Sequence, residues 1–146
     1  MFALLTIARA APRADAAAQA RLSRLIAVAI AVQAAHFAEE LGTGFHLRFP
    51  AVLGLAPWSA TFFVAFNLAW IAIWILSAAG VRRGVSAALV PLWFLALSMI
   101  ANAVAHPVLA LSAASYFPGL ITAPIAGIAG LALAHQLLRV TDARGN

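Results

Sequence analysis

The sequence predicts an all-α integral membrane bundle of about four transmembrane helices, and three observations support this fold class. Of the 146 residues, 65% are hydrophobic and 9% are charged, whereas soluble domains average roughly 45–50% apolar and about 25% charged residues. Residues 49–81 and 84–138 contain no Asp, Glu, Lys or Arg, and a membrane-spanning helix needs only about 20 such residues. The chain also has no Cys, which excludes a disulfide-stapled domain, thiolate metal ligands and a cysteine nucleophile.

Turn-forming residues and arginines divide the hydrophobic sequence into four segments. We expect transmembrane helices over residues 22–41, 57–81, 85–111 and 118–140, which together form one membrane domain over residues 22–140. Residues 1–21 are expected to form a cytoplasmic lead-in and residues 141–146 a cytoplasmic tail. The main separators are Gly42-Thr-Gly44, Arg82-Arg83-Gly84 and Ser115-Tyr-Phe-Pro-Gly119. Small residues in the last segment, Gly127 and Gly130, would let two helices approach closely.

The arginines predict the orientation of the bundle in the membrane. Of the nine arginines, only Arg48 lies outside the N-terminal region, the break at Arg82-Arg83 and the C-terminal end. Basic residues concentrate on the cytoplasmic side of membrane proteins, so we expect both termini to be cytoplasmic in a multi-pass protein of the inner cell membrane. No phosphate-binding motif accompanies the arginines, and we therefore expect a lipid bilayer but no nucleic acid as a partner.

Polar residues near the predicted outer ends of the first and third helices form the candidate site. His36, Glu39 and Glu40 share one face of the first helix at about 100° per residue, and Asn102 and His106 share one face of the third. Both helices run from inside to outside, so the two clusters lie at matching depth and can converge. The alternative is that the first helix ends before Glu39, which leaves both acids solvated. A carboxylate at membrane depth costs about 2.5–3.5 kcal/mol or more, and a structural role rarely requires two in succession. The shared faces and matching depth of the five polar residues make a buried site the stronger interpretation.

The string His36-Phe-Ala-Glu-Glu40 resembles the signature of the HXXEE family of small integral membrane proteins. Asn102, His106-Pro107 and Tyr116-Phe-Pro-Gly119 resemble the companion residues of that signature, and the resemblance spans about residues 24–139. The family is named for its motif, and its function is uncharacterised, with enzymatic activity suspected. The resemblance therefore supports the choice of site residues but says little about which reaction the protein catalyses.

The first functional hypothesis is an intramembrane enzyme that acts on a lipid or another hydrophobic small molecule. In a metal-dependent form, His36, Glu40 and His106 would bind a divalent ion, with zinc the best match to two histidines and one carboxylate. Glu39 would act as general base or orient a ligand, and Asn102 would position the substrate or a histidine ring. In a metal-free form, a protonated glutamate and a histidine would catalyse isomerisation or cyclisation.

Three further residues are expected to contact the substrate, namely Asn67, Tyr116 and Trp58. Two other classes of function stay open. One is a small proton-coupled transporter, because a four-helix chain with a membrane glutamate is similar to small multidrug exporters. The other is a non-catalytic membrane subunit in which the polar cluster only fixes helix packing. The sequence also leaves open whether the chain forms a homo-oligomer.

Overall fold

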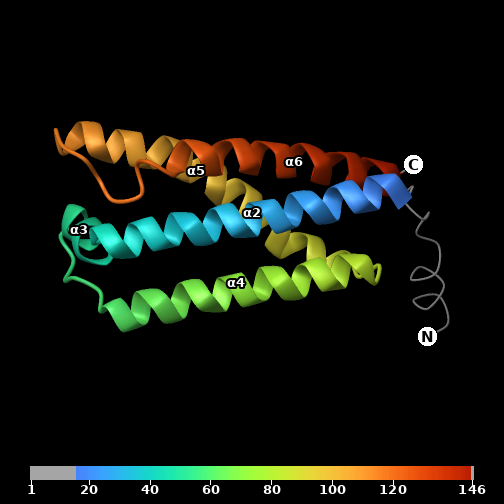
Figure 1. Ribbon diagram of the computed structural model, residues 1–146, viewed down its shortest axis with the longest axis horizontal. Coiled ribbons are helices and arrows are strands. Elements are labelled where there is room, and N and C mark those ends of the chain that lie inside the picture. The colour runs from blue at the N-terminus through green and yellow to red at the C-terminus, as the bar shows by residue number, and fades with distance from the viewer. Residues whose placement is uncertain (1–15, 146) are drawn as a thin grey trace.

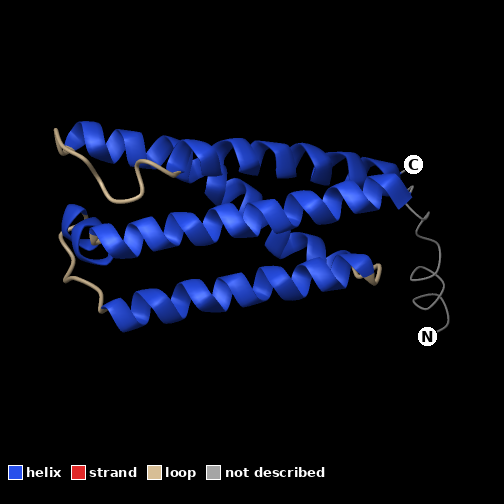
Figure 2. Ribbon diagram, viewed as in Figure 1, coloured by secondary structure: helices blue, strands red, loops and turns tan. Residues whose placement is uncertain are grey.

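The computed structural model describes residues 16–145, and within that range the chain is helical with no strand (Figure 2). The interpretation of residues 1–15 as part of a lead-in lies outside the described residues. The elements in chain order are α2 (Ala16–Thr43), α3 (Phe45–Val52), α4 (Ala60–Arg82), the 3-10 helix η1 (Ser86–Ala88), α5 (Leu89–Ser112) and α6 (Ala123–Gly145). Four of these helical stretches are long and apolar enough to cross a membrane. The predicted all-α membrane bundle is therefore confirmed.

The four long helices lie side by side, and their connections alternate between the two ends of the bundle (Figure 1). The start of α2, the turn after α4 and the end of α6 gather at one end, whereas α3 and the loop over residues 113–122 lie at the other. Arg48 in α3 is thus separated from Arg82 and Arg139, as the sequence predicted. Which end faces the cytoplasm stays a prediction.

Some helix boundaries differ from those expected from the sequence. The first helix extends back to Ala16, and the second begins at Ala60 because Ser59 caps it, its hydroxyl accepting a hydrogen bond from the Phe62 amide at 3.1 Å. A short helix, α3, occupies much of the connection that we expected to be a loop. The last helix begins at Ala123 instead of residue 118, because the preceding residues form a turn that the candidate site uses.

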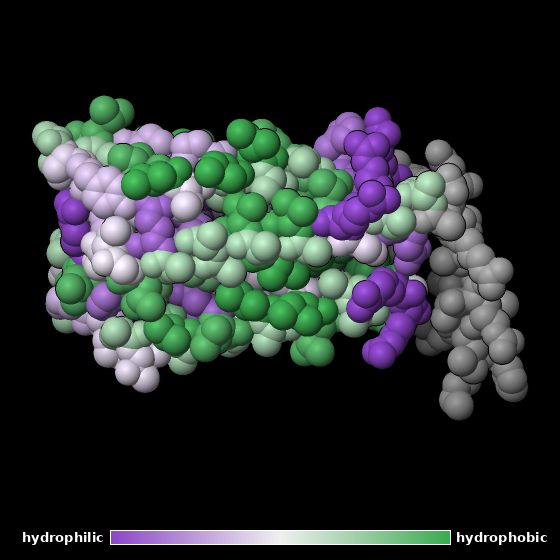
Figure 3. Space-filling model, viewed as in Figure 1, coloured by the Kyte–Doolittle hydropathy of each residue, from purple (hydrophilic) through white to green (hydrophobic). Residues whose placement is uncertain are grey.

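The core runs along the centre of the bundle, and apolar side chains also cover its outside. The buried core includes Ile26 and Ala29 of α2, Trp74 of α4, Leu92, Leu95 and Met99 of α5, and Leu133 and Leu137 of α6. On the outside, Leu76, Val90 and Ile128 are largely exposed. Figure 3 shows apolar residues around the middle of one face and hydrophilic residues near the end where α2 begins. Lipid is the solvent that suits such a surface.

Helices α5 and α6 make the closest contact, at the two glycines that the sequence singled out. A Cβ at Gly130 would lie 2.8 Å from the Ala96 carbonyl oxygen and 2.9 Å from the Met99 Cβ, and one at Gly127 would clash with the Ala103 Cβ. Only a residue without a side chain allows this separation. The close approach brings the end of α5 against the turn that precedes α6.

Candidate metal centre

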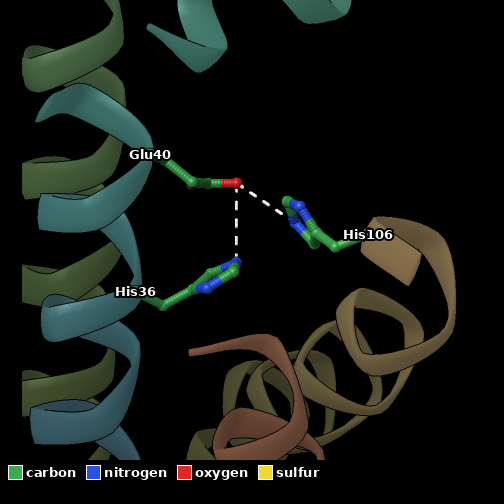
Figure 4. Close-up of side chains that lie close together, drawn as sticks. All are labelled: His36, Glu40 and His106. Atoms are coloured by element: carbon green, nitrogen blue, oxygen red, sulfur yellow. Dashed lines mark ion pairs between the residues drawn. The ribbon is translucent and has the colours of Figure 1, made fainter. Parts of the chain in front are cut away.

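Three side chains from two helices meet in the interior near the α3 end of the bundle (Figure 4). One carboxylate oxygen, Glu40 Oε1, lies 3.5 Å from His36 Nε2 and 3.4 Å from His106 Nε2. The residues are 5%, 0% and 2% exposed, respectively. His36 and Glu40 come from successive turns of α2 and His106 from α5, so the expected convergence of the first and third spans is realised for these residues.

Hydrogen bonds on the far side of each imidazole fix which nitrogen carries the proton. His106 Nδ1 lies 2.6 Å from the Pro118 carbonyl oxygen, which can only accept, so Nδ1 must donate. His36 Nδ1 lies 2.7 Å from Thr122 Oγ1, and that hydroxyl already donates its proton to Glu39 Oε2. His36 Nδ1 must therefore donate as well. In the neutral rings, both Nε2 atoms then carry lone pairs that face Glu40.

This arrangement places three electron-pair donors together, which favours a cation between them. His36 Nε2 is buried and has no hydrogen-bond partner within residues 16–145. The separations of 3.4 and 3.5 Å exceed the usual N–H···O range of about 2.7–3.2 Å. A tetrahedral zinc with bonds of about 2.0–2.2 Å holds neighbouring ligand atoms about 3.3–3.6 Å apart. The ligand atoms of the three residues all lie within 4.8 Å of one another, so the residues could hold a metal ion.

Glu39 does not point at these three side chains but at the loop between α5 and α6. Its carboxylate accepts hydrogen bonds from the Tyr116 hydroxyl at 2.6 Å, the Ile121 amide at 3.0 Å, the Thr122 amide at 2.8 Å and the Thr122 hydroxyl. Since the Thr122 hydroxyl also accepts from His36, a chain of hydrogen bonds links Glu39 to the imidazole. Of the two roles considered for Glu39, this geometry favours orientation of a ligand over that of a general base.

Tyr116 is one of the residues through which Glu39 holds the loop between α5 and α6. Burial and the hydrogen bond to Glu39 raise the pKa of its phenol, so the hydroxyl stays protonated and continues to donate. Arg48 of α3 supports the same segment, because its guanidinium donates to the Tyr116 carbonyl oxygen at 2.8 Å and lies 5.3 Å from the centre of the Phe117 ring. The loop is therefore held from both α2 and α3.

Gly119 forms the floor beneath both histidine rings. Gly119 has a φ of +89°, a left-handed backbone conformation that residues with a side chain rarely adopt. A Cβ at this position would lie 2.5 Å from His106 Cε1, 2.7 Å from His106 Nδ1 and 2.9 Å from His36 Cε1. The imidazoles thus lie directly on a glycine backbone that no larger residue could replace without moving them.

The sequence identified the three side chains that could hold a metal ion but not two residues that position them, Thr122 and Gly119. Gly119 was interpreted only as part of a turn and of the resemblance, and Thr122 carries no local signal because it forms no pattern with its neighbours. Phe45 of α3 was also missed; its ring centre lies 5.6 Å from that of His106. The contacts of these residues with the site could not be predicted from the sequence, because they form only when the loop and α3 pack against the ends of α2 and α5.

A groove of about 440 Å³ lies next to Glu40, between α2, α4 and α5. Its walls contain three of the residues expected at the site, Asn67, Asn102 and Trp58. The Asn67 amide also donates to the Phe63 carbonyl oxygen at 2.9 Å. The third residue expected to contact the substrate, Tyr116, instead donates a hydrogen bond to Glu39. Of the expected substrate contacts, Asn67 and Trp58 thus line the groove, whereas Tyr116 is held by Glu39.

Comparisons with protein-family models, with curated proteins and with solved structures found no match to this chain. The buried His-Glu-His cluster in a membrane-type helical bundle is thus the main guide to its function.

Proposed function

We propose that this chain is a metal-dependent intramembrane enzyme that acts on a lipid or another hydrophobic small molecule. The observation that carries the proposal is the convergence of Glu40 Oε1 with two histidine nitrogens whose opposite ring nitrogens are both engaged as donors. We propose further that the chain is of the HXXEE type, because its motif supplies two of the three ligands.

The ligand set suits zinc, since two histidines and one carboxylate recur in catalytic zinc sites that keep a further position open. Zinc in such a site polarises a substrate carbonyl and makes water a better nucleophile at neutral pH. Glu40 also lines the groove, so a substrate in the groove would reach the same centre. Thr122 and Pro118 hold the two rings, and Asn102 and Asn67 offer amides to orient polar parts of the substrate.

The proposed orientation places this centre in the outer half of the membrane. Arg82 and Arg139 lie at the opposite end of the bundle from α3, and the positive-inside rule makes their end cytoplasmic. The apolar walls of the groove and its place among spanning helices support a substrate that is itself dissolved in the bilayer.

The first experiment measures metal content and stability together. Purified protein is reconstituted with zinc, freed of excess metal and analysed for bound zinc and detergent melting temperature. We expect about one zinc per chain in the wild type and none in Glu40→Gln, which keeps volume and a polar amide while removing the ligand charge. The melting temperature of metal-free Glu40→Gln should equal or exceed that of the metal-free wild type, because a buried charge is removed. His135→Ala is the matched control, since this histidine lies in α6 away from the cluster and should leave zinc binding unchanged.

A second experiment separates an enzyme from the two other classes. The zinc-loaded protein is incubated with extracted membrane lipids, and products are identified by mass spectrometry, with Glu40→Gln as the inactive reference. Proton flux coupled to a cationic substrate in sealed vesicles, without lipid turnover, would instead identify a transporter. If no metal binds to the wild type and neither Glu40→Gln nor His106→Ala folds, the cluster serves only to hold the helices together and the proposal is wrong.

A further inference from the structure

The groove contains a second polar feature, formed by Gln33, which lies about one turn of α2 before His36 and two turns before Glu40, and by Trp74. Gln33 of α2 and Trp74 of α4 both line it and are 1% and 2% exposed. Within the described part of the chain, Gln33 Oε1 and Trp74 Nε1 are buried atoms without hydrogen-bond partners. Leaving such a group unpaired costs roughly 1–3 kcal/mol, so a ligand in the groove that pairs with them would be stabilised by a similar free energy.

The two unpaired atoms have opposite requirements. The amide oxygen of Gln33 needs a donor, and the indole N–H of Trp74 needs an acceptor. A ketone or ether could only accept and an ammonium could only donate, whereas one hydroxyl group does both. We propose that Gln33 and Trp74 form a hydroxyl-recognition subsite and that the substrate of the groove is an apolar alcohol. This inference deepens the proposed function by naming the substrate class.

The rest of the groove specifies the apolar body of that alcohol. The Trp74 ring stacks on that of Phe37 with the ring centroids 6.2 Å apart, and the Trp70 ring stacks on that of Phe94 with the centroids 4.4 Å apart. Such flat walls favour a ring system or an unsaturated chain. A volume of about 440 Å³ lies in the range typical of small-molecule sites. Phe62 and Phe66 are about half exposed on the outer surface, so the ligand can enter from the lipid.

The subsite also sets the distance between the hydroxyl and the reacting part of the substrate. Gln33, Phe37 and Glu40 follow one face of α2 along the groove. Seven residues at about 1.5 Å rise separate Gln33 from Glu40, which is about 10 Å along the helix. The hydroxyl would therefore be held about 10 Å along α2 from Glu40 and would act as an anchor, with chemistry at the Glu40 end of the groove.

The test uses two probes that differ only in a hydroxyl, 1-pyrenebutanol and 1-butylpyrene. Binding to metal-free, full-length protein is followed by tryptophan-to-pyrene energy transfer at a fixed detergent concentration. The quantity compared is the ratio of the two dissociation constants in each variant, because partition of a probe into micelles is the same for all variants. Relative to Gln33→Leu, we expect the wild type to favour the alcohol by about tenfold, the value of roughly one buried hydrogen bond.

Matched variants make the result specific. Gln33→Met tests the same loss with a different side-chain shape in case Gln33→Leu does not fold. Gln136→Leu replaces another buried glutamine, in α6 and outside the groove lining, and should retain the wild-type ratio. A ratio in the wild type equal to that in both Gln33 variants would overturn the inference.

The same measurement on His106→Ala separates this inference from the proposed function. Retention of the alcohol preference in that variant supports a subsite independent of the metal ligands. If zinc binding fails while the preference is present, the metal-dependent function is wrong and the subsite stands. If zinc binds while the preference is absent, only the subsite is wrong.

Discussion

Replacement of Gly119 by Ala is the sharpest available test of how the loop positions the two histidines. The added Cβ would lie 2.5 Å from His106 Cε1 and 2.9 Å from His36 Cε1. Carbon atoms in contact prefer about 3.5–4.0 Å, so the His106 ring must move by about 1 Å. Metal sites tolerate deviations of only about 0.2 Å in ligand distance. We therefore expect zinc affinity to fall by about 100-fold or more.

The effect on stability has two parts, which a control variant can separate. Alanine at φ +89° carries a backbone penalty of about 1–2 kcal/mol, and the crowding of the rings adds about 1–3 kcal/mol. Gly84 has a similar φ of +78°, but a Cβ there would meet no described atom within 4 Å. Gly84→Ala thus carries the backbone penalty alone and lies at the opposite end of the bundle from the histidines.

The assay is zinc titration of metal-free protein against a competing chelator, with the melting temperature measured on the same samples. Gly84→Ala should melt below the wild type and bind zinc with unchanged affinity. Gly119→Ala should melt lower still in the metal-free state and bind zinc much more weakly. Wild-type zinc affinity in a folded Gly119→Ala protein would refute the idea that this glycine sets the ring positions.

Thr122, Gly130 and the distribution of the arginines each support one further prediction. Thr122→Val removes the hydroxyl that holds His36 Nδ1 and should weaken zinc binding by about 10–100-fold, whereas Thr122→Ser should keep most of the wild-type affinity. Equal zinc affinities of Thr122→Val and the wild type would contradict the orienting role of Thr122. Gly130→Ala should lower the free energy of unfolding by about 1–3 kcal/mol without changing zinc affinity, because its Cβ would press against Ala96. Gly42→Ala, whose Cβ would meet no described atom within 4 Å, should leave the melting temperature of the protein unchanged. A reporter enzyme that works only in the cytoplasm should be active when fused to the C-terminus, and one that works only outside the cytoplasm should be inactive. The opposite result would place the metal centre in the other leaflet.

The membrane bundle could be predicted from composition and segment length, because these decide whether a chain is stable in lipid. The sequence also predicted that His36 and Glu40 share a face, since the helical repeat is a local property. The pairing of these residues with His106 could be predicted in outline, because two spans that run in the same direction place their polar residues at the same depth. The helix boundaries near residues 45–52 and 118–122 could not, because caps and turns there depend on contacts made after folding.

The different contacts of the two neighbouring glutamates follow only from the packing of the helices and loops around them. In the sequence, Glu39 and Glu40 are equivalent candidates. In the fold, Glu40 faces the two histidines, and Glu39 binds the amide of Thr122, which is 83 residues away along the chain. Adjacent residues on a helix point about 100° apart, so each meets a different neighbouring element. Local periodicity specifies those directions, but only the packing of α5, α6 and their connecting loop determines which partners lie along them.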